Sequence, residues 1–442
     1  MAVGRDPIPF AKRMSSYYHQ IASAAGHPEL QEPVDAQVCV IGGGFAGLNT
    51  ALGLVERGVH DVVALEAHGV GHGASGRNGG FVFGGFSRGE QALLDGLGPD
   101  RARKLYQGTL DAVELIRQRI HTHHIDCQPV EEGVLWANWF RDPAILLQRQ
   151  RLLADSFGVH WERIGPGVLR DRLHTDRYHG GLLEVRGFHF NPLRYARGLA
   201  QLVVAGGGRV HENSPALSLE REGSGWLVKT PRGSVRAEQV VLSCGGYLAG
   251  LRRRVDAGVM PIATYVMVTE PLGGRLGSAM ATGAAVYDTR FAFDYYRPLP
   301  DTRLLWGGRI SVLDRPPDAV ERLLRRDLLK VFPQLHGVRI DHAWSGLMSY
   351  ARHQMPQVGR IEPGLWLAQA FGGHGVAPTT FAGEVLASAI AEGDGQWREF
   401  EHYGLVSAMK PAGYVGAQAS YWWHQAGDAW KAWRESTSRT PT

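Results

Sequence analysis

Short apolar runs alternate with helical patterns near the start of the chain. Residues 37–41 are almost continuously apolar and predict a buried strand. Over 45–56 the apolar positions recur every three or four residues, which predicts a helix. A second apolar run, 62–66, predicts another buried strand. These three elements have the size of one β-α-β crossover unit, in which a helix joins two parallel strands.

The same two patterns continue along the rest of the chain. Helical spacing predicts helices over 100–125, 191–206, 318–332 and 379–391. Apolar runs predict a meander of strands over 209–211, 216–220, 226–230 and 234–237, and further strands over 240–246, 264–269, 303–309 and 365–368. Residues 1–33 show no regular pattern and are expected to form an arm on the surface. The aromatic residues of 414–433 are expected to pack into the core, with contact to a membrane surface as the alternative.

The composition is that of a globular protein. The 442 residues are 44% hydrophobic and 20% charged, enough for two domains or one large α/β body. The net charge of +4 is spread along the chain without a nucleic-acid motif, so no nucleic-acid partner is expected. No apolar run has the length of a membrane span, so no transmembrane segment is expected.

The cysteines and the first residues predict a cytoplasmic location. Cys39, Cys127 and Cys244 form no C-x-x-C pair, and an odd number argues against a disulfide framework. Reduced thiols suit the cytoplasm. Charges, prolines and serines interrupt residues 1–20, which therefore lack the apolar core of a signal peptide.

A glycine motif follows the first strand and opens the first helix. Its sequence, Gly42-Gly43-Gly44-Phe45-Ala46-Gly47, is the G-x-G-x-x-G of dinucleotide-binding folds. The first glycine permits the tight turn, the second lets the backbone approach a pyrophosphate, and the third lets helix and strand pack closely. The helix N-terminus then offers N–H groups and a positive dipole end to the phosphates.

An acidic residue stands where this motif requires one. Glu66 ends the second strand about 20 residues beyond the glycines, where a carboxylate accepts hydrogen bonds from ribose hydroxyls and repels a 2′-phosphate. Glu66 and its neighbour Ala67 are therefore assigned to the dinucleotide site. The motif by itself does not separate FAD from NAD.

Two later glycine-rich segments favour FAD. The first can lay backbone N–H groups along a flat ring and bring Arg77 to its phosphate or pyrimidine side; it comprises Gly73, Ala74, Ser75, Gly76, Arg77, Asn78, Gly79 and Gly80. The second joins a strand to a helix and can place a helix N-terminus near the flavin N1–C2 carbonyl, where reduction builds negative charge. Its assigned residues are Gly372, Gly373, His374, Gly375 and Val376. His374 is either a site residue or a hydrogen-bonded structural histidine.

No metal site is expected. His121, His123 and His124 lie at the polar end of a predicted helix, without a thiol or an acidic triad beside them. This pattern is typical of a solvated helix face.

In this order, the motifs resemble the FAD-dependent D-amino acid oxidase family, most closely its gamma-glutamylputrescine oxidoreductase-like branch. The resemblance covers roughly residues 15–433. The segments that carry it are 42–66, 73–80, Trp344-Ser345-Gly346, Pro356-Gln357-Val358-Gly359, 372–375 and the aromatic tail from Tyr421 to Trp433.

The resemblance implies an α/β protein of two domains. One is a Rossmann-type FAD-binding domain of the glutathione-reductase/p-hydroxybenzoate-hydroxylase-like class, and the other is a substrate domain with an antiparallel sheet. The expected division is an N-terminal arm, 1–33; a discontinuous FAD-binding domain, 34–100, 188–255 and 340–395; a substrate domain, 101–187 and 256–339; and a C-terminal aromatic tail, 396–442.

The resemblance also implies chemistry on small amines or amino acids. A neutral amine loses a hydride from its α-carbon to flavin N5, the imine hydrolyses, and O2 or another acceptor reoxidises the flavin. Oxidation with O2 releases H2O2. A gamma-glutamyl polyamine, a secondary amino acid and a D-amino acid remain open as substrates. Two other readings also remain open: a dehydrogenase that passes electrons to a quinone or carrier, and a flavin-bearing subunit of a larger complex.

Some relatives attach the flavin covalently through a histidine or cysteine. Arg77 holds the aligned histidine position here, and no cysteine lies near Gly372, so non-covalent FAD is expected. The stretch Ala351-Arg352-His353-Gln354-Met355-Pro356 lacks the aspartate that relatives often carry, which leaves the substrate open. The residues expected to act in catalysis or substrate binding are Tyr296, Arg309, Arg352, His353 and His374.

Overall fold

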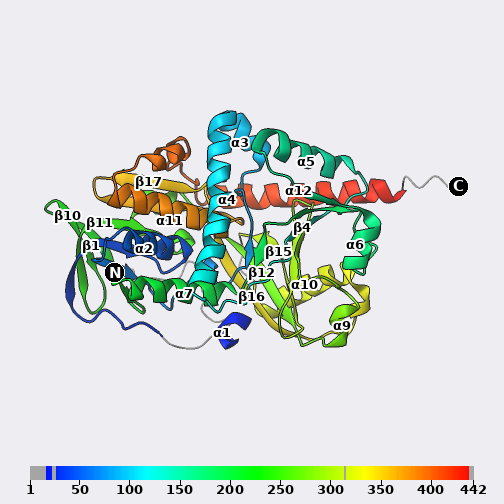
Figure 1. The fold of residues 1–442 in the computed structure, drawn as a ribbon, viewed down its shortest axis with the longest axis horizontal. Helices are drawn as coiled ribbons and strands as arrows, with labels where there is room; N and C mark the ends of the chain where they lie inside the picture. The colour runs from blue at the N-terminus through cyan, green and yellow to red at the C-terminus, as the bar shows by residue number, and fades with distance from the viewer. Residues whose placement is uncertain (1–15, 22–25, 313–314, 438–442) are drawn as a thin grey trace.

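Two eight-stranded sheets organise the part of the chain that the computed structural model describes, residues 16–21, 26–312 and 315–437 (Figure 1). The first sheet has the order β17-β18-β11-β1-β2-β8, and β10 and β9 continue it from β11. Its strands are β1 (Pro33–Ile41), β2 (Val62–Leu65), β8 (Arg209–His211), β9 (Ser218–Glu222), β10 (Gly225–Lys229), β11 (Ser234–Leu242), β17 (Gln357–Glu362) and β18 (Leu365–Gln369).

The centre of the first sheet is parallel, as the β-α-β pattern predicts. Strand β1 pairs in parallel with β2 and β11, and β11 pairs in parallel with β18. The prediction that 209–211 belongs to the meander is wrong, because β8 pairs in parallel with β2 at the sheet edge. The physical reason is that helix α7 (Pro192–Ala205) returns the chain to this edge, where a parallel pairing follows a helical crossover.

Helices cover one face of this sheet and form the largest core. Helix α2 (Phe45–Glu56) packs against α7, α11 (Val376–Ala391) and the first sheet. Eleven of its twelve residues are buried, which explains why its apolar pattern is broader than a single stripe. Helix α7 begins as its sequence predicts: the Asn191 side chain accepts a hydrogen bond from the Arg194 N–H at 3.2 Å, and Pro192 occupies the first helical position.

The second sheet is antiparallel except for one pair of strands, β4 and β13. Its order is β16-β12-β15-β14-β13-β4-β6-β5. Its strands are β4 (Val134–Ala137), β5 (Glu162–Ile164), β6 (Gly181–Glu184), β12 (Met260–Thr269), β13 (Ala285–Asp288), β14 (Asp294–Pro298), β15 (Leu304–Ser311) and β16 (Ile340–Tyr350). Helix α10 (Pro317–Val331) packs on β12, β15 and β16.

The remaining elements connect or flank the two sheets. A small two-stranded sheet pairs β3 (Phe81–Val82) with β7 (Phe188–His189). Long α4 stands between the two halves of the molecule (Figure 1). The other helices are α1 (Tyr17–Ile21), α3 (Glu90–Leu97), α4 (Pro99–Thr122), α5 (Ala144–Phe157), α6 (Pro166–Arg172), α8 (Arg253–Ala257), α9 (Gly274–Gly277) and α12 (Ala412–Thr437).

The division into domains stays a prediction, and two segments differ from it in how they pack. Strand β16 was placed with the FAD-binding domain, but it pairs along its length with β12 in the second sheet. Helix α4 was placed in the substrate domain, but its apolar residues pack into the core shared with α2 and α11. Neither segment could be assigned from local pattern, because each one lies where the two halves meet.

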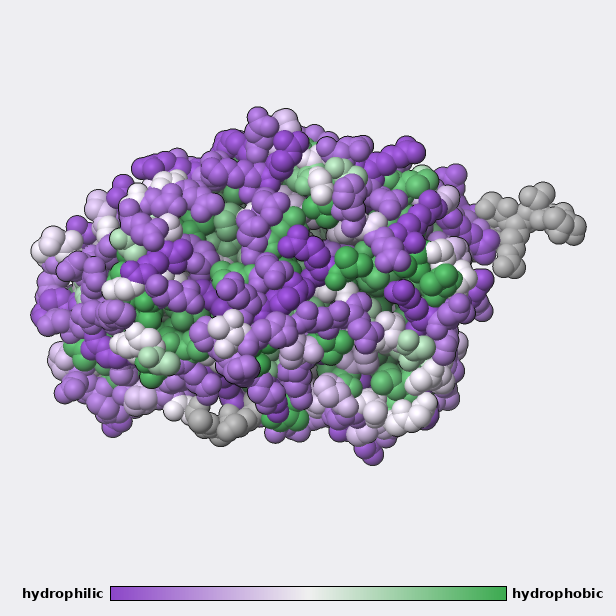
Figure 2. All heavy atoms as spheres, in the orientation of Figure 1, coloured by the Kyte–Doolittle hydropathy of each residue, from purple (hydrophilic) through white to green (hydrophobic). Residues whose placement is uncertain are grey.

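The two ends of the chain also differ from expectation. Residues 1–15 and 22–25 of the expected arm lie outside the described residues, but Tyr17 and Tyr18 form part of a short helix and are buried. Four tryptophans of α12 are 54–78% exposed, so the core packing expected for them is wrong; they are Trp422, Trp423, Trp430 and Trp433. No helix in the described ranges is both long enough and apolar enough to cross a membrane. The face shown in Figure 2 is mostly hydrophilic, with hydrophobic residues in scattered groups.

Candidate functional site

The glycine motif forms a turn that leaves no room for side chains. Gly42 has φ of +118°, and a Cβ on it would lie 2.7 Å from the Ser243 carbonyl oxygen. A Cβ on Gly47 would lie 2.0 Å from the Gly42 oxygen. Both positions therefore require glycine, the first for its backbone conformation and the second for close packing of α2 against β1.

The N-terminus of α2 opens toward this turn. Gly44 precedes the helix and provides no side-chain cap. The Phe45 N–H donates to the Ser75 hydroxyl at 2.9 Å, which joins the turn to the second glycine-rich segment. The N–H groups of the first turn beyond Phe45 and the positive end of the helix dipole are what a pyrophosphate binds.

Glu66 lies beside the turn with its carboxylate held by the backbone. One oxygen accepts from the Gly43 N–H at 2.8 Å and the other from the His68 N–H at 3.0 Å. Burial raises the pKa of Glu66, and these two N–H groups oppose the rise. Each carboxylate oxygen keeps a further lone pair for a hydroxyl donor, while Ala67 is exposed next to it.

The segment 73–80 is fixed by its own asparagine. The Asn78 amide donates to the Ala74 and Ser75 carbonyls at 3.0 and 2.9 Å and accepts from the Gly80 N–H at 2.7 Å. Arg77 is only 4% exposed, and its Nε donates to the His72 carbonyl at 2.8 Å. This loop therefore holds a buried guanidinium through backbone carbonyl groups.

The segment 371–376 forms a tight turn before α11. Gly372 has φ of +64°, and a Cβ there would lie 2.3 Å from the Ser87 hydroxyl. Its N–H donates to the Ser349 carbonyl at 2.8 Å. The helix begins at Val376 after Gly375, without a side-chain cap, so it is a second helix N-terminus open to a ligand.

Strand β16 brings the loop and this turn together. The Trp344 indole donates to the Arg77 carbonyl at 2.9 Å, and the Arg77 guanidinium donates to the Ser345 carbonyl at 3.4 Å. Ser349, which contacts the turn, lies four residues further along the strand, about 13 Å away at the usual rise per residue. The two segments therefore border one region, although some 300 residues separate them in sequence.

The three segments together fit FAD. Two helix N-termini preceded by glycine, a glycine turn closed to side chains and a half-buried carboxylate are the groups that a dinucleotide needs. The buried Arg77 loop and the Gly372 turn add two backbone-lined edges on which a flat ring system can rest.

His374 lies against this region as a neutral imidazole. Its Nε2 is 3.1 Å from the Phe83 carbonyl, so this nitrogen carries the hydrogen and donates it. Its ring packs against the Phe83 ring with centroids 4.0 Å apart. Burial lowers the pKa of His374 to about 4, so the residue is uncharged at neutral pH.

A wall of aromatic rings runs from loop 73–80 to His374. We call it the aromatic wall. Successive ring centroids lie 5.3–6.4 Å apart in the order Phe81, Tyr295, Phe293, Tyr287 and Phe83. These rings are partly exposed rather than core residues, so they line a surface that a small molecule can reach.

Tyr296, which was expected to act at the site, does not belong to the aromatic wall. Tyr296 is fully buried on the opposite face of β14, where its ring stacks on Trp306 with centroids 4.5 Å apart. Its neighbour Tyr295 belongs to the aromatic wall, and a Cβ on Gly79 would lie 2.6 Å from the Tyr295 ring. Successive side chains of a strand point to opposite faces, and the sequence alone could not decide which of these two adjacent tyrosines faces the wall.

Arg309 is also directed away from the aromatic wall. It has φ of +59° and sits at an irregularity in the pairing of β12 with β15. Its guanidinium makes a two-pronged contact with the Asp327 carboxylate of α10, at 2.7 and 2.8 Å. A bulge of this kind redirects a side chain, which sequence alternation does not reveal.

Arg352 and His353 contact the segment that follows α11 rather than the aromatic wall. Arg352 is exposed and lies 3.4 Å from the Met409 sulfur. The His353 Nδ1 accepts from the Met355 N–H, and its Nε2 is 3.3 Å from the Gly404 carbonyl. Burial lowers the pKa of His353, and both ring nitrogens already have backbone partners.

Arg297, which follows Tyr296 on β14, is a buried guanidinium that holds the site together, and it was not among the residues expected to act in catalysis. Arg297 is 2% exposed and donates to the Gly79 carbonyl at 2.6 Å and the Phe190 carbonyl at 2.9 Å. It also lies 3.2 Å from Nδ1 of His189. Burial and this arginine lower the pKa of His189 to about 3, so the imidazole is neutral and accepts. Its place in the tyrosine-rich strand was the only signal in the sequence.

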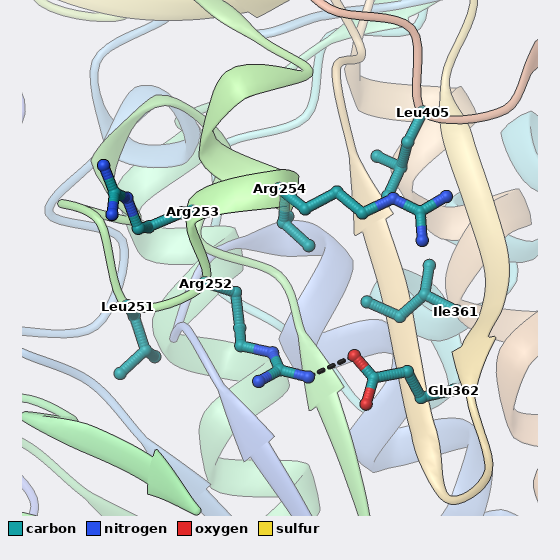
Figure 3. A pocket seen from close by; sticks show the side chains of 8 residues that line it. Leu251, Arg252, Arg253, Arg254, Ile361, Glu362 and Leu405 are labelled. Atoms are coloured by element: carbon teal, nitrogen blue, oxygen red, sulfur yellow. Dashed lines mark hydrogen bonds and ion pairs between the residues drawn. The ribbon is translucent and has the colours of Figure 1, made fainter.

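A hollow elsewhere on the surface is separate from this region (Figure 3). It is lined by Leu251, Arg252, Arg253, Arg254, Val255, Ile361, Glu362 and Leu405. Arg252 forms an ion pair with Glu362 across it. None of the residues expected to bind cofactor or substrate lines this hollow.

Comparison with known proteins agrees with the geometry. Residues 37–389 match the family described as DAO, FAD dependent oxidoreductase. The chain is 37% identical to gamma-glutamylputrescine oxidoreductase of Escherichia coli over 387 residues, which cover 85% of this chain and 88% of that one. It is 34% identical to a probable oxidoreductase, OrdL, of Haemophilus influenzae, over 85% of this chain and 87% of the other.

Solved structures share the fold. Glycine oxidase from Geobacillus kaustophilus superposes with a TM-score of 0.70 at 19% identity, covering 84% of this chain and 98% of its own. L-proline dehydrogenase from P. horikoshii superposes with a TM-score of 0.68 at 20% identity, covering 86% and 100%. The glycine turn, the two helix N-termini and these matches lead to one conclusion: the chain belongs to the DAO family of FAD-dependent oxidoreductases.

Proposed function

We propose that this enzyme oxidises a C–N bond of a small amine, with O2 as electron acceptor and H2O2 as product, and binds FAD without a covalent link. The substrate we propose is a gamma-glutamylputrescine-like amine. The proposal rests on one observation above all: a partly exposed aromatic wall lies between the Arg77 loop and His374, beside the segments that fit FAD.

The aromatic wall suits an uncharged amine. Bound FAD supplies a two-electron acceptor for the hydride that the substrate carbon gives up. The rings of Tyr295, Phe293 and Tyr287 present low-polarity surface, and such surroundings disfavour a charged nitrogen and lower its pKa. The wall also excludes water from the bond that reacts, because its rings contact one another from Phe81 to Phe83.

His374 contributes a ring held in a fixed position rather than a charge. Its Nε2–H is held by the Phe83 carbonyl, and its backbone N–H donates to the Ser87 hydroxyl at 3.1 Å. Both contacts keep the ring at the end of the aromatic wall. With a pKa of about 4, His374 does not change charge over the range in which amines are oxidised.

Arg297 on β14 and Arg309 on β15 favour a substrate without a carboxylate on the reacting carbon, an amine rather than an α-amino acid. A carboxylate is best held by a guanidinium with two free N–H groups. Arg309 is paired with Asp327, and Arg297 is occupied by two carbonyls and His189. Similarity to gamma-glutamylputrescine oxidoreductase supports the same choice; a secondary amino acid is the alternative substrate.

A peroxide-coupled screen of amines and amino acids on the purified yellow protein tests this function. We expect peroxide with gamma-glutamylputrescine-like amines and none with D-amino acids. If an amine reduces the flavin in the absence of oxygen, but no peroxide forms when oxygen is present, the enzyme is a dehydrogenase rather than an oxidase. No reduction by any amine or amino acid overturns the proposal.

One observation favours the dehydrogenase as a second candidate. The exposed tryptophans of α12 form an apolar surface of the sort that contacts another molecule. A carrier protein or a quinone at a membrane surface would then take the electrons. Reduction of a soluble quinone faster than O2 would support this candidate.

We place the enzyme in the cytoplasm. The described cysteines, Cys39, Cys127 and Cys244, are all free. Burial raises the pKa of each thiol well above neutrality, to about 12 for Cys127 and Cys244. Free, unreactive thiols suit a reducing compartment. Fractionation of cells that express the tagged chain tests this placement.

A further inference from the structure

A group of buried and half-buried polar side chains lies behind the aromatic wall. We call it the polar cluster. Its members come from five separate elements, α3, α4, α5, β6 and β13, and are Glu90, Tyr106, Arg149, Glu184 and Tyr287. Arg149 donates to the Glu90 carboxylate at 2.6 Å. Its guanidinium lies between the rings of Trp136 and Trp161, 4.9 and 5.1 Å from their centroids.

The polar cluster holds several buried atoms without hydrogen-bond partners among the described residues. They are the Tyr106 and Tyr287 hydroxyls, Arg149 Nε and Glu184 Oε2. Tyr106 is 1% exposed and Glu184 is 4% exposed. A buried polar atom without a partner has lost its hydrogen bonds to water and gained none in the fold, which is unfavourable. Three of these atoms, the two hydroxyls and Glu184 Oε2, can accept a hydrogen bond, come from three elements and are electrostatic neighbours of one another or of Arg149, so they point to a donor group that binds among them; the Arg149 Nε–H is itself a donor and is not part of this set.

The polar cluster adjoins the site already described. A Cβ on Gly85 would meet the Tyr106 ring at 3.5 Å, and Glu90 Oε1 and His374 Cε1 at 3.7 Å each. The Gly84 N–H donates to Glu184 Oε1 at 3.4 Å. Tyr287 belongs to both groups, since its ring is part of the aromatic wall and its hydroxyl faces the polar cluster. A ligand that lies along the wall therefore reaches this cluster at the His374 end.

The charges of the polar cluster favour a cation. Two carboxylates, Glu90 and Glu184, surround one guanidinium, and Arg149 is already paired with Glu90. Glu184 Oε2 is an acceptor without a donor. The Tyr287 and Tyr106 hydroxyls can accept as well as donate. An ammonium group supplies three donors and the positive charge that Glu184 lacks.

We propose that the polar cluster binds a protonated amino group at the end of the substrate remote from the C–N bond that is oxidised. This inference rests on the proposed function. The aromatic wall takes the neutral, reacting nitrogen, and the polar cluster takes the second, charged one. The preferred substrate is therefore a diamine, a polyamine or an amine conjugate with a second ammonium group, rather than a simple alkylamine.

Two ligands that differ only at the remote end test the proposal. 1,4-Diaminobutane carries the second ammonium, and 4-aminobutan-1-ol replaces it with a hydroxyl. Rapid anaerobic mixing of the holoenzyme with each ligand, followed by the change in the flavin spectrum that precedes any reduction, gives a dissociation constant, Kd, for each. At about pH 8 we expect the diamine to bind at least tenfold more tightly than the amino alcohol.

Glu184→Gln removes the charge and keeps the shape of the side chain. We expect it to abolish the preference for the diamine while leaving the Kd of the amino alcohol within twofold. Glu162→Gln is the matched control, because Glu162 is an exposed glutamate on β5, the strand that pairs with β6. Tyr287→Phe, which removes only a hydroxyl, is expected to reduce the preference severalfold.

Each outcome has a separate meaning. An undiminished preference for the diamine in Glu184→Gln, with normal FAD content, overturns the inference, as does equal binding of both ligands by the parent enzyme. If Glu184→Gln does not fold, Tyr287→Phe decides by the same criterion. Diamine binding that depends on Glu184, without reduction of the flavin by any amine, supports the binding site and contradicts the proposed function.

Discussion

The FAD-binding segments and the substrate side of the site are built in different ways. Around Gly42 and Gly372 the backbone conformation makes the site, and an added Cβ would collide with the Ser243 backbone at Gly42 and with the Ser87 and Tyr350 side chains at Gly372. On the substrate side, side chains from the second sheet and from α3, α4 and α5 make it. The first kind of site depends on local conformation, and the second depends on how distant elements pack. Mutations should therefore abolish FAD binding at the first kind of site and change the affinity for substrate at the second.

Gly47→Ala is expected to have the largest effect. The new Cβ would lie 2.0 Å from the Gly42 carbonyl oxygen, in the backbone turn itself, so α2 and β1 must separate. We expect at least a hundredfold weaker FAD binding and a purified protein with little yellow colour. The ratio of flavin to protein absorbance measures this directly.

Gly427→Ala provides the control for that change. Gly427 lies in α12 with nothing within 4 Å of an added Cβ. Alanine favours a helix over glycine by about 1 kcal/mol, so this variant should bind FAD normally and be no less stable. Normal FAD content in Gly47→Ala would show that the turn tolerates side chains and would remove the contrast between the two regions.

Tyr296→Ala and Tyr295→Ala separate the two faces of β14. Tyr296 is fully buried against Trp306 and Phe332, so its truncation should cost roughly 3–5 kcal/mol of stability. Tyr295 lies in the aromatic wall, so its truncation should mainly raise KM for the amine, with a smaller loss of stability. Urea unfolding and steady-state kinetics on both variants make the comparison. A raised KM in Tyr296→Ala, with the larger loss of stability in Tyr295→Ala, would mean that Tyr296 faces the substrate.

Glu184→Gln should raise stability at alkaline pH while it weakens ligand binding. Burial raises the pKa of Glu184 from 4.5 to about 7, against the opposing effects of the Gly84 N–H and Arg149. The folded state therefore holds a proton that the unfolded state releases, so this group destabilises the fold as pH rises from about 4.5 to 7. The full effect, up to about 3 kcal/mol, is present above pH 7.

The melting temperature, Tm, measures this linkage. The groups that face Glu184 are Arg149, Glu90 and Arg186, with Tyr106 and Tyr287 beside them. At about pH 5 the parent enzyme and Glu184→Gln should have nearly the same Tm. At about pH 8 the Tm of the variant should be a few degrees higher. A lower Tm for the variant at pH 8 would show that the carboxylate is a structural partner rather than a binding group.

Arg352→Gln is expected to have the smallest effect. Arg352 is exposed, and its contact with the Met409 sulfur is weak. We expect kcat/KM for the best amine to change less than twofold. A tenfold loss of kcat/KM would indicate that Arg352 contacts the substrate. It would also weaken the distinction between the aromatic wall and the exposed surface.

Much of the first region could be predicted from sequence because its signals are local. The glycines from Gly42 to Gly47 and the spacing to Glu66 specify strand, turn and helix within one segment. Helix α2 runs over the residues that its apolar spacing predicts. Here the residues of the motif themselves form the site, so recognising the motif in the sequence identifies the site residues.

The second region could not be predicted because its side chains depend on packing and register. Tyr295 and Tyr296 differ only by which face of β14 each occupies. Arg309 has the residue type to hold a carboxylate, but an irregularity in the strand turns it to Asp327. Glu90 and Glu184 carry no motif and come near each other only because α5 packs against both α3 and β6.

Anaerobic mixing of the purified holoenzyme with 1,4-diaminobutane and its N-gamma-glutamyl conjugate tests the central claim most directly. The amine-oxidation mechanism predicts that at least one of them bleaches the yellow flavin completely, and that oxygen then restores the colour with one H2O2 formed per flavin. A flavin that stays oxidised with both of them, and with every other amine and amino acid offered, would contradict it.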